Sequence, residues 1–268
     1  MYKKFNLELK DDRINYFSNI SENDVESYKN KVEKISKELL ADFEESLVVT
    51  ENGTIDGTKT IETWFPNYKA DIFLSHSHKD IDLAIKLACW LENNFGVRVF
   101  IDSLLWKNID DLQKEIDKKY TFSEITKTYD YDLRNITTSH VHAMLSTALN
   151  DMIDSSECVM FLNTPSSIEL STLKNSTFSP WIYSEIKAAN LLRINIPSRF
   201  IQKRYGSRDL QHSREILNEA PAIKYDTDLS KFHKITYQSL IAWNIDRLIH
   251  EIKGTETLNS LYNMVGEG

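Results

Sequence analysis

Cysteine is scarce in this sequence of 268 residues, which contains only Cys89 and Cys158. Each lies in an apolar stretch, so the pattern predicts two buried thiols in a reducing compartment and no disulfide framework. Long apolar runs are also missing. No run approaches the roughly 18 residues of a membrane-spanning helix, and the N-terminal MYKKFNLELKDDR lacks the apolar core of a signal peptide. We therefore expect a soluble, cytoplasmic protein with no membrane partner.

Clustered positive charge is the third feature that the sequence lacks. The formal net charge is -8, and Lys and Arg are not gathered into a basic patch of the kind that neutralises phosphates. Nucleic acid is therefore not expected as a partner. In contrast, hydrophobic residues make up 41% of the chain, which is enough to bury the core of a large domain.

Residues 1–65 differ from the rest of the chain and are expected to form a helical N-terminal extension. They contain 9 Lys and Arg and 14 Asp and Glu, so -5 of the net charge of -8 lies there. Apolar residues recur at steps of three and four, as in an amphipathic helix, after Ser21 as a candidate N-cap. The residues of this seam are Val25, Tyr28, Val32, Ile35, Leu39 and Phe43. We expect the seam to pack on the protein's own body, with self-pairing as a coiled coil as the alternative.

From residue 70 onward, short apolar runs alternate with helical patterns. The sequence predicts a strand over 70–74, a helix over 81–94 and a strand over 97–101. Asp80 is placed to cap the helix at its N-terminus, and Gly96 is placed to end it in a left-handed conformation.

A further helix over about 141–153 and a strand over 158–162 continue this alternation, which predicts parallel βαβ crossovers and an open α/β sheet. Ligands bind beyond the carboxyl ends of the strands in such sheets. Residues 75–80, Asp102 and residues 163–179 would all lie at that edge.

Two stretches are not explained by this alternation. Residues 103–140 are rich in charge and are expected to form a long insertion at the functional edge, with one short helix, acting as a lid or a binding element. Residues 194–237 are irregular, with a late strand over 222–225. The last predicted helix has Ile241, Ile245, Leu248 and Ile252 on one face, and residues 256–268 are assigned to a C-terminal tail.

The segment Trp181-Ile-Tyr-Ser-Glu185 predicts a helix that presents an aromatic ring and a carboxylate on one face. Ser179 is a candidate N-cap, and Pro180 suits the first helical position, whose amide needs no partner. On this pattern alone, a core tryptophan followed by a solvated glutamate is the simpler interpretation.

Three segments together resemble the TIR (Toll/interleukin-1 receptor) domain family. Asp71-Ile-Phe-Leu-Ser75-His-Ser-His-Lys-Asp80 is similar to its first strand and loop, Phe100-Ile-Asp102 to the end of its second strand, and Trp181 to Glu185 to its tryptophan and glutamate helix. The three segments occur in the family's order. The resemblance covers about residues 68–255, and we place a TIR-like domain at 66–255.

The resemblance implies a flavodoxin-like open parallel sheet and, as in many bacterial members, cleavage of NAD at the nicotinamide–ribose bond. Glu185 would be the catalytic residue, because one carboxylate can stabilise the positive charge that develops on the ribose. Ser75, His76, Ser77, His78, Asp102 and Trp181 would contact the nucleotide. No cofactor beyond NAD as substrate and no metal are implied.

Further expectations follow from the same resemblance. These are self-association through the TIR-like domain, a product that is either ADP-ribose or a cyclic ADP-ribose signal for a downstream effector protein, and a role in bacterial anti-phage defence. The chain departs from the family in two places. The loop after the second strand is long and lacks glycine and proline over 103–139, and the family's loop arginines are replaced by His76, Ser77 and His78.

Two other functions are compatible with the same residues. His76-Ser-His78-Lys-Asp80 and His140-Val-His142 contain ligand types that zinc prefers, which would suit a zinc-dependent hydrolase. However, Ile81 stands where the zinc motif requires another histidine. The other alternative is a non-enzymatic TIR-like module that signals by assembly.

Overall fold

A computed structural model describes residues 1–11, 15–40, 47–170, 175–200 and 225–266 of the chain. The helices are α1 (Glu22–Leu40), α2 (Gly57–Trp64), η1 (His78–Asp80), α3 (Ile81–Phe95), α4 (Asp102–Leu105), α5 (Ile109–Tyr120), α6 (Tyr131–Ser155), α7 (Pro180–Leu191), η2 (Ser198–Phe200), α8 (Tyr237–His250) and α9 (Glu256–Val265). The strands are β1 (Lys3–Glu8), β2 (Ile72–Ser75), β3 (Val99–Phe100), β4 (Phe122–Ser123), β5 (Thr128–Tyr129), β6 (Cys158–Asn163), β7 (Glu169–Leu170), β8 (Asn175–Thr177), β9 (Tyr225–Asp226) and β10 (His233–Thr236). No helix in the described parts is long and apolar enough to cross a membrane.

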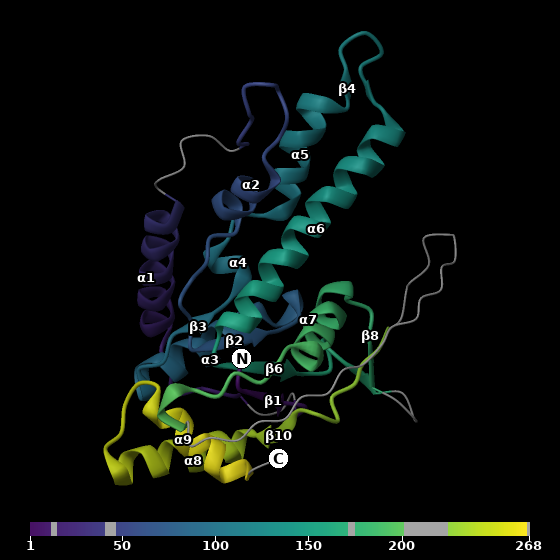
Figure 1. Cartoon of the computed structure of the whole chain (residues 1–268). Helices are drawn as coiled ribbons and strands as arrows, with labels where there is room; N and C mark the ends of the chain where they lie inside the picture. Colours follow the sequence, from purple (N-terminus) through teal and green to yellow (C-terminus); the bar gives the residue numbers. More distant parts are fainter. Residues whose placement is uncertain (12–14, 41–46, 171–174, 201–224, 267–268) are drawn as a thin grey trace.

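The main sheet has five strands in the order β10-β1-β6-β2-β3, and all neighbouring strands are parallel (Figure 1). Every residue of β2 and β6 is buried, as expected for central strands that are covered on both faces. One group of helices consists of α3 with its neighbours α1 and α8, and another of α6 with its neighbours α2, α5 and α7. The α/β architecture expected from the sequence is therefore confirmed.

Strand β1 corrects the assignment of residues 1–65 to a helical extension outside the sheet. It lies between β6 and β10, and its residues Phe5 and Leu7 are fully buried. The strands β3, β2 and β6 lie next to one another in that order, and β1 separates β6 from β10. The N-terminal segment is thus an integral part of the fold.

Helix α1 packs on the body of the protein, as expected. It contacts α3 and α4, and Tyr28 and Val32 are buried. At its start the Ser21 hydroxyl accepts a hydrogen bond from the Asp24 amide, while the Asp24 carboxylate accepts one from the Ser21 amide. The predicted seam residue Phe43 lies outside the described residues.

The predicted strand–helix–strand unit is present, with ends that shift by one or two residues. Helix α3 ends at Gly96, which has a φ of 70° and donates its amide to the Glu92 carbonyl. Asp80 occupies the N-cap position but does not cap the helix through its side chain, because its carboxylate accepts a hydrogen bond from the Thr164 hydroxyl. Asp80 therefore joins the loops that follow β2 and β6.

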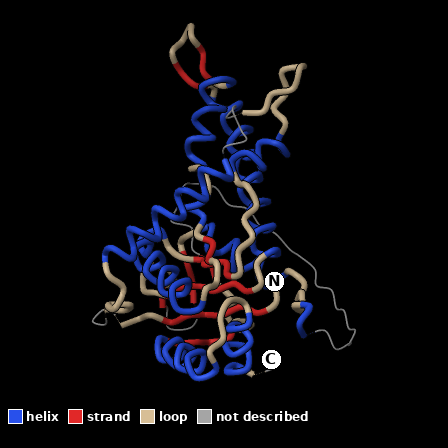
Figure 2. Tube along the Cα trace, turned by 90° about the vertical axis from the view of Figure 1, so that its left-hand side faces the viewer, coloured by secondary structure: helices blue, strands red, loops and turns tan. Residues whose placement is uncertain are grey.

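For residues 103–140 the sequence predicts a long loop with one short helix, and this prediction is wrong. They form α4, α5, the β4–β5 hairpin and the first part of α6, which begins at Tyr131 rather than near residue 141. We call residues 109–141 the arm. Its two helices run side by side away from the sheet, with the hairpin at the far end (Figures 1 and 2). The buried Asp117 accepts hydrogen bonds from Arg134, Gln113 and Thr137, which fastens α5 to α6.

The C-terminal part also differs from the prediction. Strand β10 belongs to the main sheet, and residues 256–265 form helix α9 with Leu258, Leu261 and Tyr262 buried, so this segment is not a tail. Helix α8 buries Leu240 and Trp243, whereas Ile245 and Leu248 are more than half exposed. Residues 222–224 of the predicted late strand lie outside the described residues, and Tyr225 begins β9.

Candidate functional site

A cavity of about 330 Å³ opens where β2 and β3 end, between α5, α6 and α7. This is the edge at which ligands bind in open parallel sheets. Its polar lining includes His76, His78, Asp102 and Glu185, and Trp181 contributes to its aromatic wall. These five side chains therefore meet in one place although they come from three separate segments of the sequence.

Glu185 is placed by helix α7, whose start follows the sequence closely. The Ser179 hydroxyl accepts a hydrogen bond from the Ile182 amide, and Pro180 occupies the first turn. The Glu185 side chain then lies one turn after Trp181, and the residue is only 8% exposed. The interpretation of Glu185 as a solvated surface residue is therefore wrong.

The Glu185 carboxyl has one hydrogen-bond partner among the described residues, the hydroxyl of Ser75, which donates to Oε2. The pKa of Glu185 is raised from 4.5 to about 8, chiefly by burial and next by the neighbouring Asp102, while the hydrogen bond from Ser75 acts in the opposite direction. In the unliganded protein at neutral pH, Glu185 is therefore mainly protonated.

Asp102 is the first residue of α4 and lines the same cavity. Its Oδ1 atom accepts a hydrogen bond from the Ser103 amide at 2.7 Å. Asp102 thus lies near enough to Glu185 to disfavour a negative charge on it, and two carboxyl groups in one cavity favour a positively charged ligand.

The loop after β2 contributes unequally to the cavity. His76 and His78 line it, whereas Ser75 contributes by its hydrogen bond to Glu185, which lines the cavity. Ser77 is not among the lining residues, and its hydroxyl accepts a hydrogen bond from the Lys79 amide at the start of η1. The structure therefore gives Ser77 a capping role rather than the expected contact with a nucleotide.

Trp181 forms one wall, and its ring meets the ring of His142 edge to face at a centroid distance of 5.5 Å. His142 lies on α6, close to His140, and both are exposed. Among the described residues, no group of three or more His, Cys, Asp or Glu side chains is arranged to hold a metal ion. The zinc alternative thus gains no support from the described part of the chain.

Several lining residues were not predicted from the sequence. The residues from the segment between α4 and α5 are Trp106, Lys107 and Asn108, and those from α6 are Leu145 and Leu149. The Trp106 indole donates to the Pro66 carbonyl at 2.9 Å, which fixes this wall. A signal was available for Asn108, because it precedes Ile109-Asp-Asp and caps α5 through its side chain.

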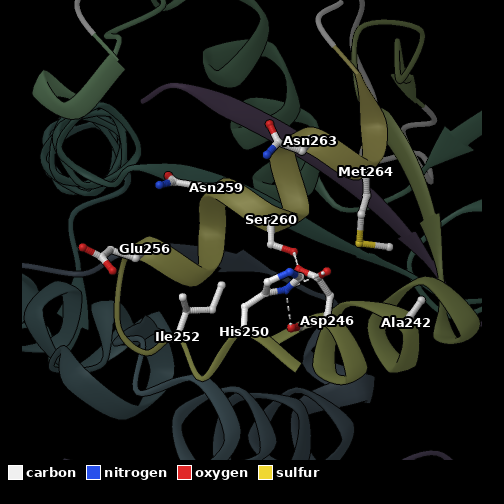
Figure 3. Close-up of a pocket in the computed structure, with 9 residues that line it drawn as sticks. All are labelled: Ala242, Asp246, His250, Ile252, Glu256, Asn259, Ser260, Asn263 and Met264. Carbon is white, nitrogen blue, oxygen red and sulfur yellow. Dashed lines mark hydrogen bonds and ion pairs between the residues drawn. The ribbon is translucent and has the colours of Figure 1, made fainter. Parts of the chain in front are cut away.

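A larger groove lies between α8 and α9, with a volume of about 760 Å³ (Figure 3). It contains Asp246, His250 and Ser260, the residue types of a hydrolytic triad. However, the Ser260 hydroxyl donates to the Asp246 carboxylate, and the ring of His250 hydrogen-bonds to the Asp246 carbonyl. Because the serine is bonded to the aspartate and not to the histidine, these three residues do not have the serine–histidine–aspartate arrangement of a hydrolytic triad.

Comparison with known proteins gives no match, whether to a protein-family model, to a curated protein or to a solved structure. The geometry of the cavity therefore has to support any functional proposal directly.

Proposed function

We propose that the chain is a TIR-like NAD nucleosidase that cleaves the nicotinamide–ribose bond in the cavity around Glu185. One observation carries this proposal: a buried carboxyl group is held by Ser75, faces Asp102 and lies one helical turn from Trp181. The flavodoxin-like order of β3, β2 and β6 supports it as well.

The charge of the substrate provides the link between this geometry and the reaction. The nicotinamide ring of NAD is a pyridinium cation, and a nearby positive charge favours the ionised form of a carboxyl group. Seating the ring near Glu185 would lower the pKa of this residue and release its proton. The resulting carboxylate is then in the ionised form that can stabilise a positive charge on the ribose.

In the proposed reaction the bond between ribose C1′ and the pyridinium nitrogen breaks. Its electron pair goes to the nitrogen, so nicotinamide leaves as a neutral molecule and no acid is required. The Glu185 carboxylate stabilises the positive charge that develops on the ribose. A water molecule then adds to C1′ and loses a proton, giving ADP-ribose.

Capture of C1′ by a nucleophilic group of the same molecule would instead give a cyclic ADP-ribose. Either product suits a nucleotide signal or NAD depletion in bacterial anti-phage defence, and a cyclic product would act through an effector protein. The proposal needs no cofactor besides NAD as substrate. We also propose self-association, which a dependence of the specific activity on protein concentration would support.

The second candidate is a non-enzymatic assembly module. The observation that favours it is the arm, on which Leu133 and Ile136, three positions apart and so neighbours on α6, are 46% and 56% exposed. Large exposed apolar side chains that lie close together are typical of protein-binding surfaces.

Chromatography of NAD incubated with the purified chain separates the two functions. The proposed enzyme releases nicotinamide together with an equal amount of ADP-ribose or its cyclic form, identified by mass. An assembly module forms concentration-dependent oligomers and leaves NAD intact at every protein concentration.

A further inference from the structure

The ring of His76 has one nitrogen that is satisfied and one that is not. Its Nδ1 atom lies 3.2 Å from the carbonyl oxygen of Leu74. Since a carbonyl can only accept a hydrogen bond, Nδ1 must carry the hydrogen. In the neutral ring, this leaves Nε2 as an acceptor with a free lone pair.

The Nε2 atom is buried and has no hydrogen-bond partner among the described residues. Buried polar atoms without a partner are rare in folded proteins, because each has given up its hydrogen bond to water. His76 lines the cavity, and it directly follows Ser75, the residue that is bonded to Glu185. The residue that carries the unpaired acceptor therefore lines the same site.

The protein groups nearby do not satisfy this acceptor. Asp102 and Glu185 line the cavity from α4 and α7, His78 lines it from η1, and Lys107 and Asp110 line it from the segment around the start of α5. None of them is hydrogen-bonded to Nε2. A ligand that brings an N–H or O–H group would give this atom its partner.

We propose that His76 is a specificity-determining residue, whose Nε2 atom accepts a hydrogen bond from an N–H or O–H group of the substrate. This inference rests on the proposed function for the identity of the substrate. NAD offers two sources of such a donor near the bond that breaks. One is the carboxamide N–H of nicotinamide, and the other is a hydroxyl of the adjoining ribose.

Two substitutions separate the two nitrogens of the ring. His76→Asn keeps an N–H group that can reach the Leu74 carbonyl and removes the acceptor in the cavity. His76→Gln places a carbonyl oxygen near the position of Nε2 and so retains an acceptor. His140→Asn, on the exposed side of α6, serves as the control for a histidine substitution outside the cavity.

The experiment measures kcat and KM for NAD and for three analogues. One analogue has a carboxylate in place of the carboxamide, and the others lack the 2′- or the 3′-hydroxyl of the nicotinamide ribose. We expect His76→Asn to lower kcat/KM for NAD by about 10- to 100-fold and His76→Gln to restore much of the loss. The parent should have a higher kcat/KM for NAD than for each analogue. In His76→Asn this difference should disappear for one analogue only, and the group that this analogue lacks is the donor.

Two results would overturn the inference. The first is a kcat/KM for NAD that is unchanged in His76→Asn. The second is a loss of kcat/KM that is equal for NAD and for all analogues in both variants. Nitrogen NMR of the parent gives a readout that does not depend on turnover. In the free parent, the Nε2 signal should be that of a nitrogen without a hydrogen. In Glu185→Gln, this signal should shift when NAD binds. An Nε2 atom that already carries the hydrogen in the neutral ring would contradict the proposal. Nicotinamide release by the parent tests the proposed function separately, whatever the His76 variants do.

Discussion

The hydroxyl of Ser75 donates a hydrogen bond to the carboxyl group of Glu185, although 110 positions separate the two residues in the sequence. Ser75 ends β2 and Glu185 lies on α7, so the bond joins the sheet to the helix that forms the cavity wall. This hydrogen bond also lowers the pKa of Glu185, which burial and Asp102 raise. The Ser75 hydroxyl therefore partly offsets the effect of burial on the protonation of Glu185.

Ser75→Ala should move the pH dependence of the reaction. Removing the hydroxyl takes away an interaction with the carboxylate, so the pKa of Glu185 rises above its value of about 8. Because kcat/KM reports the ionisation of the free enzyme, its rise with pH should shift to higher pH in the variant. A pH profile of nicotinamide release measures this shift, and superimposable profiles for parent and variant would contradict the assigned role of Ser75.

Binding of NAD should release a proton from the protein. Below pH 8 most molecules carry the proton on Glu185, and the cationic ring favours its loss. Titration calorimetry at pH 7 in buffers of different ionisation enthalpy, with a carbocyclic NAD analogue that keeps the pyridinium ring and cannot be cleaved, should give close to one proton released per molecule bound to the parent. The reduced dinucleotide, whose ring is neutral, should release far less. Equal proton release on binding of the two ligands would show that the charge of the ring does not cause Glu185 to lose its proton.

Leu7→Ala should strongly destabilise the fold, because β1 lies inside the sheet and Leu7 is fully buried. We expect a loss of about 2–5 kcal/mol in the free energy of unfolding, measured with urea. Leu133→Ala is the matched control, since this leucine is 46% exposed on α6, and it should change the free energy of unfolding by less than about 0.5 kcal/mol. Similar small losses in both variants would mean that the N-terminal strand is not integral to the sheet.

Removing Arg134 from its ion pair with Asp117 should destabilise the arm more than removing both charges does. Arg134→Gln leaves the Asp117 carboxylate buried with only Gln113 and Thr137 as partners. Asp117→Asn removes that charge, whereas Arg134 keeps much of its exposure to solvent. Arg134→Gln alone should therefore destabilise the arm more than the double variant does, by about 1–3 kcal/mol. Hydrogen exchange of α5 and α6 measures this difference, and the opposite order would refute it.

Local signals in the sequence predicted the parts of the structure that local chemistry determines. Ser179 and Pro180 mark the start of α7, and Gly96 marks the end of α3, because helix ends depend on the nearest few residues. The same signals placed Trp181 and Glu185 on one helix. The convergence of Ser75, Asp102 and Glu185 followed from the rule that parallel strands present their carboxyl ends at one edge.

The errors arose where distant contacts determine the structure. Strand β1 contains Lys3 and Lys4, and only its position between β6 and β10 makes it a central strand. Strand β10 has a single buried residue, Ile235, so its alternation is hard to detect. For most of the arm the sequence predicts a loop, because the charged helices bury few side chains and the Asp117–Arg134 pair that joins them links residues 17 positions apart.

The central claim is that the Glu185 carboxyl group acts on NAD. The measurement that tests it most directly is the rate of nicotinamide release by Glu185→Gln relative to the parent, at equal concentration and with equal thermal unfolding. Glutamine preserves the size of the side chain and cannot ionise. Glu26→Gln, on the exposed face of α1, is the control. We predict a rate for Glu185→Gln at least about 100-fold below that of the parent and an unchanged rate for Glu26→Gln, whereas equal release by Glu185→Gln and the parent would contradict the account.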